Sequence, residues 1–100
     1  MNNARASYEL TAKAREDYAD ELFALDRIRQ AIEDRAAEGY RELRVMQLHP
    51  LDLRDCTAAR TLEDWLDDNE YRYAWRPIPP LSDPQYSPMT EDYAELVVFW

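Results

Sequence analysis

The chain holds 100 residues, 46% of them hydrophobic and 12% aromatic, which is enough apolar material for the core of one domain and excludes a disordered chain. Its 21 acidic residues outweigh 12 basic ones, and the net charge of -9 repels nucleic-acid phosphates and anionic membranes, so we expect direct binding to neither. Residues 1–12 lack the apolar core of a signal peptide, and the single Cys56 cannot form an intrachain disulfide, which predicts a cytoplasmic location.

A long helix is predicted at the start of the chain. Residues 4–38 contain neither proline nor glycine, and apolar side chains recur at helical spacing from Tyr18 onward. Asn3 suits the N-cap, and Gly39 suits the position just past the C-cap. A continuous helix would run roughly 50 Å, too long for a compact domain of this size. Either the helix therefore breaks before Tyr18, or residues 1–17 project as a helical extension toward a target or a second copy.

A strand and a second helix follow. Residues 40–48 alternate in polarity, as a strand does, and end at a His-Pro pair. Residues 57–68 carry one apolar and one acidic face at helical spacing, with Asp55 or Thr57 as N-cap and Asn69 as the stop. The sequence thus changes from helix to strand and back to helix.

The last third predicts two strands around a long loop. Residues 71–76 alternate aromatic side chains with small or basic ones, and Pro77 is expected to close this strand. Five of the six prolines fall in residues 77–91, which predicts an extended loop. Residues 93–100 are apolar on both faces, as a central strand is. We predict one α+β domain with the order α-β-α-β-β, helices packed on one face of a three-stranded sheet, and strands two and three antiparallel.

Two groups of carboxylates recur at the i, i+4 spacing that places side chains on one helix face. The first group is Glu16, Asp17, Asp20 and Glu21, and the second is Glu63, Asp64, Asp67 and Asp68. Like charges at this spacing destabilise a helix slightly, which favours a role in recognising a basic surface such as a groove that normally holds nucleic acid. The alternative is that these residues only keep the protein soluble.

Three further residues complete the predicted partner-binding set. Tyr86 lies in the proline-rich loop, where a tyrosine is available for binding. Arg72 and Arg76 alternate with the aromatic residues of the second strand, so we expect both on the opposite face of the sheet, as rim contacts.

The sequence predicts no catalytic site, cofactor or metal centre. His49 and Cys56 are the only residues of their kind, so a Cys–His dyad would have to use both, and a metal set would have to combine His49 with Asp52 and Asp55. With one glycine in the chain, no phosphate-binding glycine loop can form. A small hydrolase or metal enzyme is therefore the least favoured class.

The chain resembles the small accessory proteins of phages and mobile elements, including the anti-CRISPR proteins. The resemblance rests on the length, the acidic charge, the helix-to-strand passage Ala36-Ala37-Glu38-Gly39-Tyr40 and the terminal strand Glu95-Leu96-Val97-Val98-Phe99-Trp100. It implies a non-catalytic inhibitor or adaptor that blocks a host complex, such as a CRISPR-associated one in the host cytoplasm, by offering acidic surface where nucleic acid would bind. The alternative function is a structural protein that forms homodimers through its long first helix.

Overall fold

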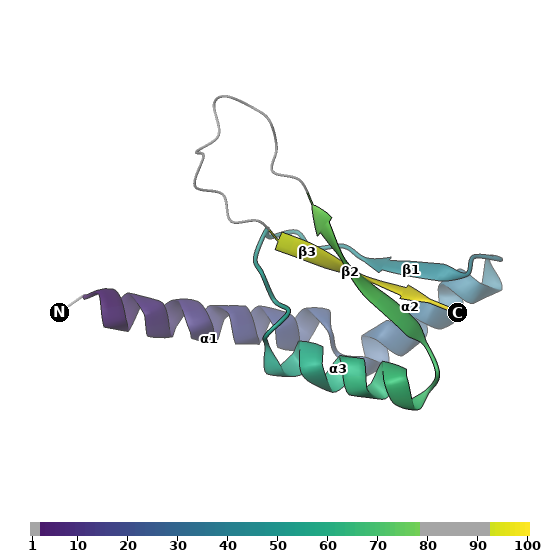
Figure 1. Cartoon of the computed structure of the whole chain (residues 1–100), viewed down its shortest axis with the longest axis horizontal. Helices are drawn as coiled ribbons and strands as arrows, with labels where there is room; N and C mark the ends of the chain where they lie inside the picture. The colour runs from purple at the N-terminus through teal and green to yellow at the C-terminus, as the bar shows by residue number, and fades with distance from the viewer. Residues whose placement is uncertain (1–2, 79–92) are drawn as a thin grey trace, which may run out of the picture.

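A computed structural model describes residues 3–78 and 93–100, which form an α+β fold (Figure 1). In chain order the elements are α1 (Ala4–Leu22), α2 (Leu25–Ala37), β1 (Glu42–Val45), α3 (Thr57–Asp68), β2 (Arg72–Ile78) and β3 (Tyr93–Phe99). None of the helices in these ranges is both long enough and apolar enough to cross a bilayer.

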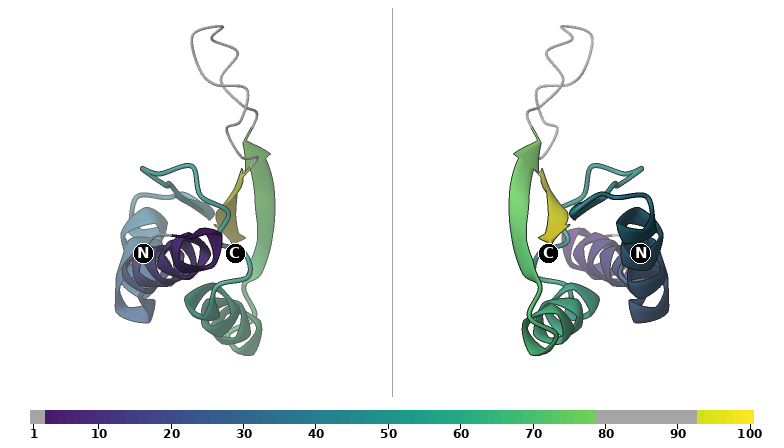
Figure 2. Two further views of the ribbon diagram at one scale, coloured as in Figure 1. Left: turned by 90° about the vertical axis from the view of Figure 1, so that its left-hand side faces the viewer. Right: turned by 90° about the vertical axis from the view of Figure 1, so that its right-hand side faces the viewer.

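Within the described residues the sheet has three strands in the order β1-β3-β2, and both neighbours run antiparallel to β3. Val45 on one side and Trp75 on the other both pair with Leu96 of the central strand. The helices gather on one side of the sheet and leave the other side without a helix (Figure 2). The predicted α+β class, the central last strand and the antiparallel pairing of the last two strands are confirmed.

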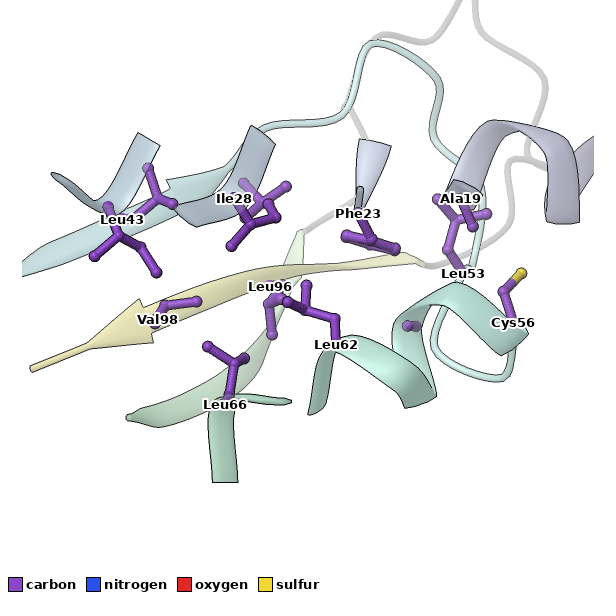
Figure 3. Close-up of a cluster of buried hydrophobic side chains, with 13 residues drawn as sticks. Ala19, Phe23, Ile28, Leu43, Leu53, Cys56, Leu62, Leu66, Leu96 and Val98 are labelled. Atoms are coloured by element: carbon purple, nitrogen blue, oxygen red, sulfur yellow. The ribbon is translucent and has the colours of Figure 1, made fainter. Parts of the chain in front are cut away.

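The core lies between the sheet and the helices (Figure 3). Leu96 and Val98 point from the central strand into this layer and have no exposed surface, because Leu62 and Leu66 of α3 pack beneath them. Each buried leucine or valine contributes about 1.5 to 3 kcal/mol relative to an exposed one. The fully buried residues of α3 therefore fix this helix firmly to the scaffold.

The first predicted helix is divided in two, and the break falls at Phe23 and Ala24, after Tyr18 and not before it. Ala24 has non-helical backbone angles (φ -55°, ψ 126°). The break lets the ring of Phe23 turn into the core, where it is 2% exposed and meets Trp75 edge-on at 5.8 Å. Burial of this ring offsets the lost helical hydrogen bonds, and the chain then turns so that α2 packs on β1.

The N-terminal part of α1 projects, as the second expected outcome had it, whereas the expected break before Tyr18 does not occur. The described residues before Arg15 are exposed apart from Ala6, which is half-buried, and the first buried residue of the helix is Ala19. Asn3 caps the helix as predicted, because its side chain accepts the N–H of Ala6 at 2.9 Å. We call residues 4–14 the α1 arm.

Two strands differ from the predicted ranges. β1 ends at Val45 because the N–H of Gln47 turns away from the ladder and donates to the side chain of Glu95. β2 continues through Pro77 to Ile78, where the sequence predicted an end. Proline fits there because β2 is an edge strand and one of its sides needs no ladder donors.

Candidate protein-binding surfaces

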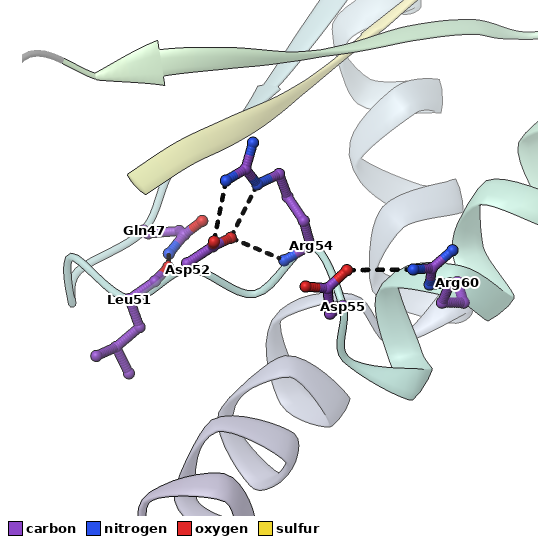
Figure 4. Close-up of polar contacts among 6 residues, drawn as sticks. All are labelled: Gln47, Leu51, Asp52, Arg54, Asp55 and Arg60. Carbon is purple, nitrogen blue, oxygen red and sulfur yellow. Dashed lines mark hydrogen bonds and ion pairs between the residues drawn. The ribbon is translucent and has the colours of Figure 1, made fainter. Parts of the chain in front are cut away.

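One face of α3 presents four carboxylates, and we call Glu63, Asp64, Asp67 and Asp68 the α3 acidic face. Asp64, Asp67 and Asp68 are exposed and Glu63 is half-buried. No basic side chain among the described residues forms an ion pair with any of the four. The basic residue of this helix, Arg60, instead pairs with Asp55 at 3.1 Å (Figure 4). The negative charge of this face is therefore not neutralised by described residues.

Local forces oppose this arrangement of charge. The two i, i+4 pairs place like charges side by side, and Asp67 and Asp68 occupy the last turn, where the helix dipole favours cations. These carboxylates therefore do not stabilise the helix that carries them.

Aromatic side chains border the α3 acidic face. The hydroxyl of Tyr73 donates to Oδ2 of Asp67 at 3.5 Å, and burial, followed by the negative charges of Glu63 and Asp67, raises the pKa of Tyr73. Trp65 stacks on Tyr71 with ring centroids 5.6 Å apart. Sequence reasoning assigned Tyr71 and Tyr73 to a face of the sheet without linking them to α3. Their position at the edge of the sheet leaves both rings half-exposed.

The carboxylates of α1 have a different environment. Both carboxylate oxygens of Glu16 accept the backbone N–H of Thr57, at 3.1 and 3.2 Å, at the start of α3. The predicted N-caps do not form, because the N-cap residue is Cys56 and it makes no side-chain cap bond. Asp17 pairs with Lys13 at 2.8 Å. The predicted group is thus split, since two members already have partners within the fold.

Only half of the α1 group remains open. Asp20 and Glu21 are exposed, and neither carboxylate forms an ion pair with a described basic residue. The structure therefore favours α3 over α1 as the acidic surface.

Arg72 and Arg76 lie on the uncovered face of the sheet, opposite the aromatic residues of β2 as predicted. Both are exposed and neither forms an ion pair with a described residue, whereas their neighbour Arg44 pairs with Glu95 at 2.6 Å. They do not form a rim around the α3 acidic face, because that helix packs against the other face of the sheet. Tyr86, the remaining predicted contact, lies outside the described residues.

The alternative catalytic and metal residues do not converge. Asp52 is held by the guanidinium of Arg54 at 2.9 and 3.0 Å, and this hydrogen bonding lowers the pKa of Asp52 (Figure 4). The ring of His49 lies edge-on to Tyr18, with centroids 5.1 Å apart. No group of three or more metal-ligating side chains occurs in residues 3–78 and 93–100.

Cys56 is buried, and desolvation followed by the nearby charge of Glu16 raises the pKa of its thiol. Because the thiolate is the reactive species, a raised pKa makes this thiol a weak nucleophile at neutral pH. The chemistry of the residue matches a structural role beside the start of α3.

Comparison of the chain with protein-family models, with curated proteins and with solved structures found no match. The functional argument therefore depends on the surfaces described above.

Proposed function

We propose that this protein is a non-catalytic inhibitor or adaptor that binds a basic protein surface through the α3 acidic face. A surface that otherwise holds nucleic acid fits best, because it already carries arginine and lysine side chains spaced to meet a line of negative charges. The observation that supports this proposal is the absence of described ion-pair partners for four neighbouring carboxylates on one helix.

The rigidity of α3 makes the face suitable for recognition. Leu62 and Leu66 are completely buried on the inner side of the helix, and Glu16 caps its first turn. The carboxylates are consequently held on a fixed support, so a partner does not have to order them on binding. Trp65 and Tyr73 beside them add the kind of aromatic surface that is enriched in protein interfaces.

A first experiment measures binding of a fluorescent oligoarginine peptide by the full chain at increasing salt. We expect the affinity to fall with salt, and to fall by about tenfold when Glu63→Gln, Asp64→Asn, Asp67→Asn and Asp68→Asn are combined. The matched control removes the same amount of charge at exposed carboxylates outside both acidic groups, through Glu33→Gln, Asp34→Asn, Glu38→Gln and Glu42→Gln. An equal loss in both variants would show that total charge decides binding and would reject the α3 acidic face.

A second experiment addresses the partner. The full chain, the fourfold α3 variant and the matched control are each used as bait in nuclease-treated lysate of a candidate host. We expect a protein retained by the wild type and the control but lost from the α3 variant, and we expect duplex DNA to compete with its capture. A partner that remains bound to the α3 variant would contradict the proposal.

A further inference from the structure

The strand β2 lies at one edge of the sheet, and its outer side is open. The strand order β1-β3-β2 gives β2 one neighbour among the described residues. Figure 2 shows β2 as the outermost strand, with no described element beyond its free edge. The edge of a sheet presents unpaired N–H and C=O groups, to which another extended chain can bind.

The hydrogen bonds of β3 determine which residues of β2 have free backbone groups. The N–H of Trp100 donates to the carbonyl of Arg41 at 3.1 Å, on the β1 side of the central strand. Alternate residues of a strand direct their backbone groups toward opposite neighbours, so those of Phe99 point toward β2. Phe99 pairs with Arg72. The backbone groups of Arg72, and of every second residue after it in β2, therefore point toward β3.

The residues between them direct their backbone groups outward. These are Tyr73, Trp75 and Pro77, and a proline fits at the third position because its missing N–H is not needed by β3. Tyr73 and Trp75 each keep a free N–H and a free C=O. An antiparallel strand laid along this edge can therefore form four backbone hydrogen bonds with these two residues.

On the uncovered face of the sheet, two guanidinium groups border the same edge. Arg72 and Arg76 have no hydrogen bond, ion pair or ring contact with any described residue, whereas every other basic residue of the chain has an interaction with another group. The small Ala74 separates them. In a chain with 21 acidic residues and 12 basic ones, this pair is available to carboxylates from outside.

On the helix side of the sheet, the edge presents aromatic surface. Tyr73 and Trp75 pack against the core and are nevertheless half-exposed, because no described strand lies beside them. Side chains of an added strand would lie directly opposite these rings, at the distance at which cross-strand pairs stabilise a sheet. Both faces of the edge are thus incomplete without a further strand.

We propose that β2 binds an extended acidic segment of a partner protein as an added antiparallel strand. The segment places acidic side chains opposite Arg72 and Arg76, and apolar side chains opposite Tyr73 and Trp75. It therefore carries acidic residues at the first and fifth of five positions and apolar residues at the second and fourth. Charge disfavours a second copy as the occupant, because two antiparallel β2 strands centred on Ala74 would set arginine against arginine.

Titration of the isotope-labelled full chain with a short peptide, followed by nuclear magnetic resonance, tests the site. The probe is the acetylated and amidated peptide Thr-Glu-Val-Thr-Val-Glu-Thr. We expect the amide signals of Tyr73 and Trp75 to shift, and the affinity to fall about fivefold when both glutamates of the peptide are replaced by glutamine. The net charge of -9 repels the glutamate peptide more strongly, so a preference for it has to come from local contacts. Equal or tighter binding of the glutamine peptide would overturn the proposal.

Variants of the protein show which arginines are responsible. Arg72→Gln/Arg76→Gln should bind the glutamate and glutamine peptides with equal affinity. The matched control, Arg5→Gln/Arg29→Gln, removes the same charge from exposed helical positions and should keep the preference. Loss of the preference in both variants would show that net charge decides binding and would reject the β2 edge. The fourfold α3 variant should keep the preference, so this result is separate from that of the proposed function.

Methylation of the peptide backbone tests the strand pairing. The N–H groups of the two valines point toward Tyr73 and Trp75, and the N–H of the central threonine points away from the sheet. We expect N-methylation of either valine to abolish binding, and N-methylation of the central threonine to leave it unchanged. Equal effects at the two kinds of position would contradict the added strand. Shifts of the Tyr73 and Trp75 signals on concentrating the protein without peptide would identify a second copy as the occupant and would also overturn the proposal.

Discussion

The acidic groups of α1 and α3 have the same spacing in the sequence and opposite environments in the fold. In α1, Glu16 is hydrogen-bonded to the first turn of α3 and Asp17 is paired with Lys13. In α3, no member of the acidic face has a described ion-pair partner. The spacing of carboxylates along a helix thus specifies which side chains share a face, and the neighbouring elements determine whether that face is available.

The difference has a simple physical origin. The N-terminus of a helix presents N–H groups that need acceptors, and α3 begins after a cysteine that supplies none. Glu16 reaches that end from α1, across 41 positions of sequence, and acts as the missing cap. Among the described residues, no basic side chain forms an ion pair with the outer side of α3, which receives only the long hydrogen bond from the Tyr73 hydroxyl at 3.5 Å.

The largest expected effect comes from Glu95, the most buried carboxylate among the described residues, at 2% exposure. It pairs with Arg44 at 2.6 Å and accepts the N–H of Gln47 at 3.0 Å, which joins β1 to β3. We expect Glu95→Ala to lower the free energy of unfolding by about 2 to 3 kcal/mol in urea denaturation, since both bonds to a charged acceptor are lost. Glu95→Gln keeps an acceptor for the N–H of Gln47 and should lose less. Equal losses would show that the ion pair alone matters.

The second prediction compares two neighbouring carboxylates of α1, Glu16 and Asp17. Glu16→Ala should lower the free energy of unfolding by about 1 to 2 kcal/mol, because α3 loses its only described side-chain cap. Asp17→Ala removes an exposed i, i+4 pair and should cost about 0.5 kcal/mol or less. Urea denaturation of both variants measures the difference. Comparable losses would mean that Glu16 does not stabilise α3.

The third prediction concerns the stability of the α3 acidic face itself. The fourfold Gln/Asn variant should be more stable than the wild type by about 0.5 to 1 kcal/mol at low salt, because two like-charged pairs and two unfavourable charges in the last turn disappear. Urea denaturation at low and high salt measures the gain, which should shrink as salt screens the repulsion. A loss of stability at low salt would reveal attractive contacts of these side chains within the fold.

The smallest effect concerns the proton on Tyr73. Because burial and the charges of Glu63 and Asp67 raise the pKa of Tyr73 above its ordinary value, ultraviolet titration should detect a tyrosine that ionises late. The unfolded chain releases this proton at lower pH, so the stability it contributes is complete below the ordinary tyrosine pKa and is lost as pH rises through the folded one. The fourfold α3 variant should move the titration back part of the way, whereas a Tyr73→Phe variant should lack the late step.

The sequence predicted the elements whose own pattern of apolar and polar residues shows which of their side chains are buried. Residues 57–68 form a helix with the predicted bounds, and residues 93–99 form the predicted central strand because apolar side chains on both faces suit a strand between two neighbours. Gly39 adopts the positive φ, 95°, that a residue after a helix C-cap requires. The break at Phe23 escaped prediction, because only the position of Trp75 in space makes it favourable to turn that ring inward.

The candidate surface was predictable to the same degree. Helical spacing was enough to find Glu63, Asp64, Asp67 and Asp68, since they lie opposite the apolar side of their own helix. The hydrogen bond from Thr57 to Glu16 joins distant segments, and no local pattern signals it. The exposure of Met46 and Leu48 was also missed, because both residues fell within a predicted strand and their exposure follows from the early end of β1.

The continuation of β2 through Pro77 has a consequence for the protein at high concentration. An outer strand offers unpaired backbone groups that can recruit further strands and begin fibrillar aggregation. Proline supplies no N–H for such growth, and the exposed guanidinium groups of Arg72 and Arg76 repel an identical strand laid alongside. The irregular residue at the end of β2 therefore helps this small sheet to stop at three strands.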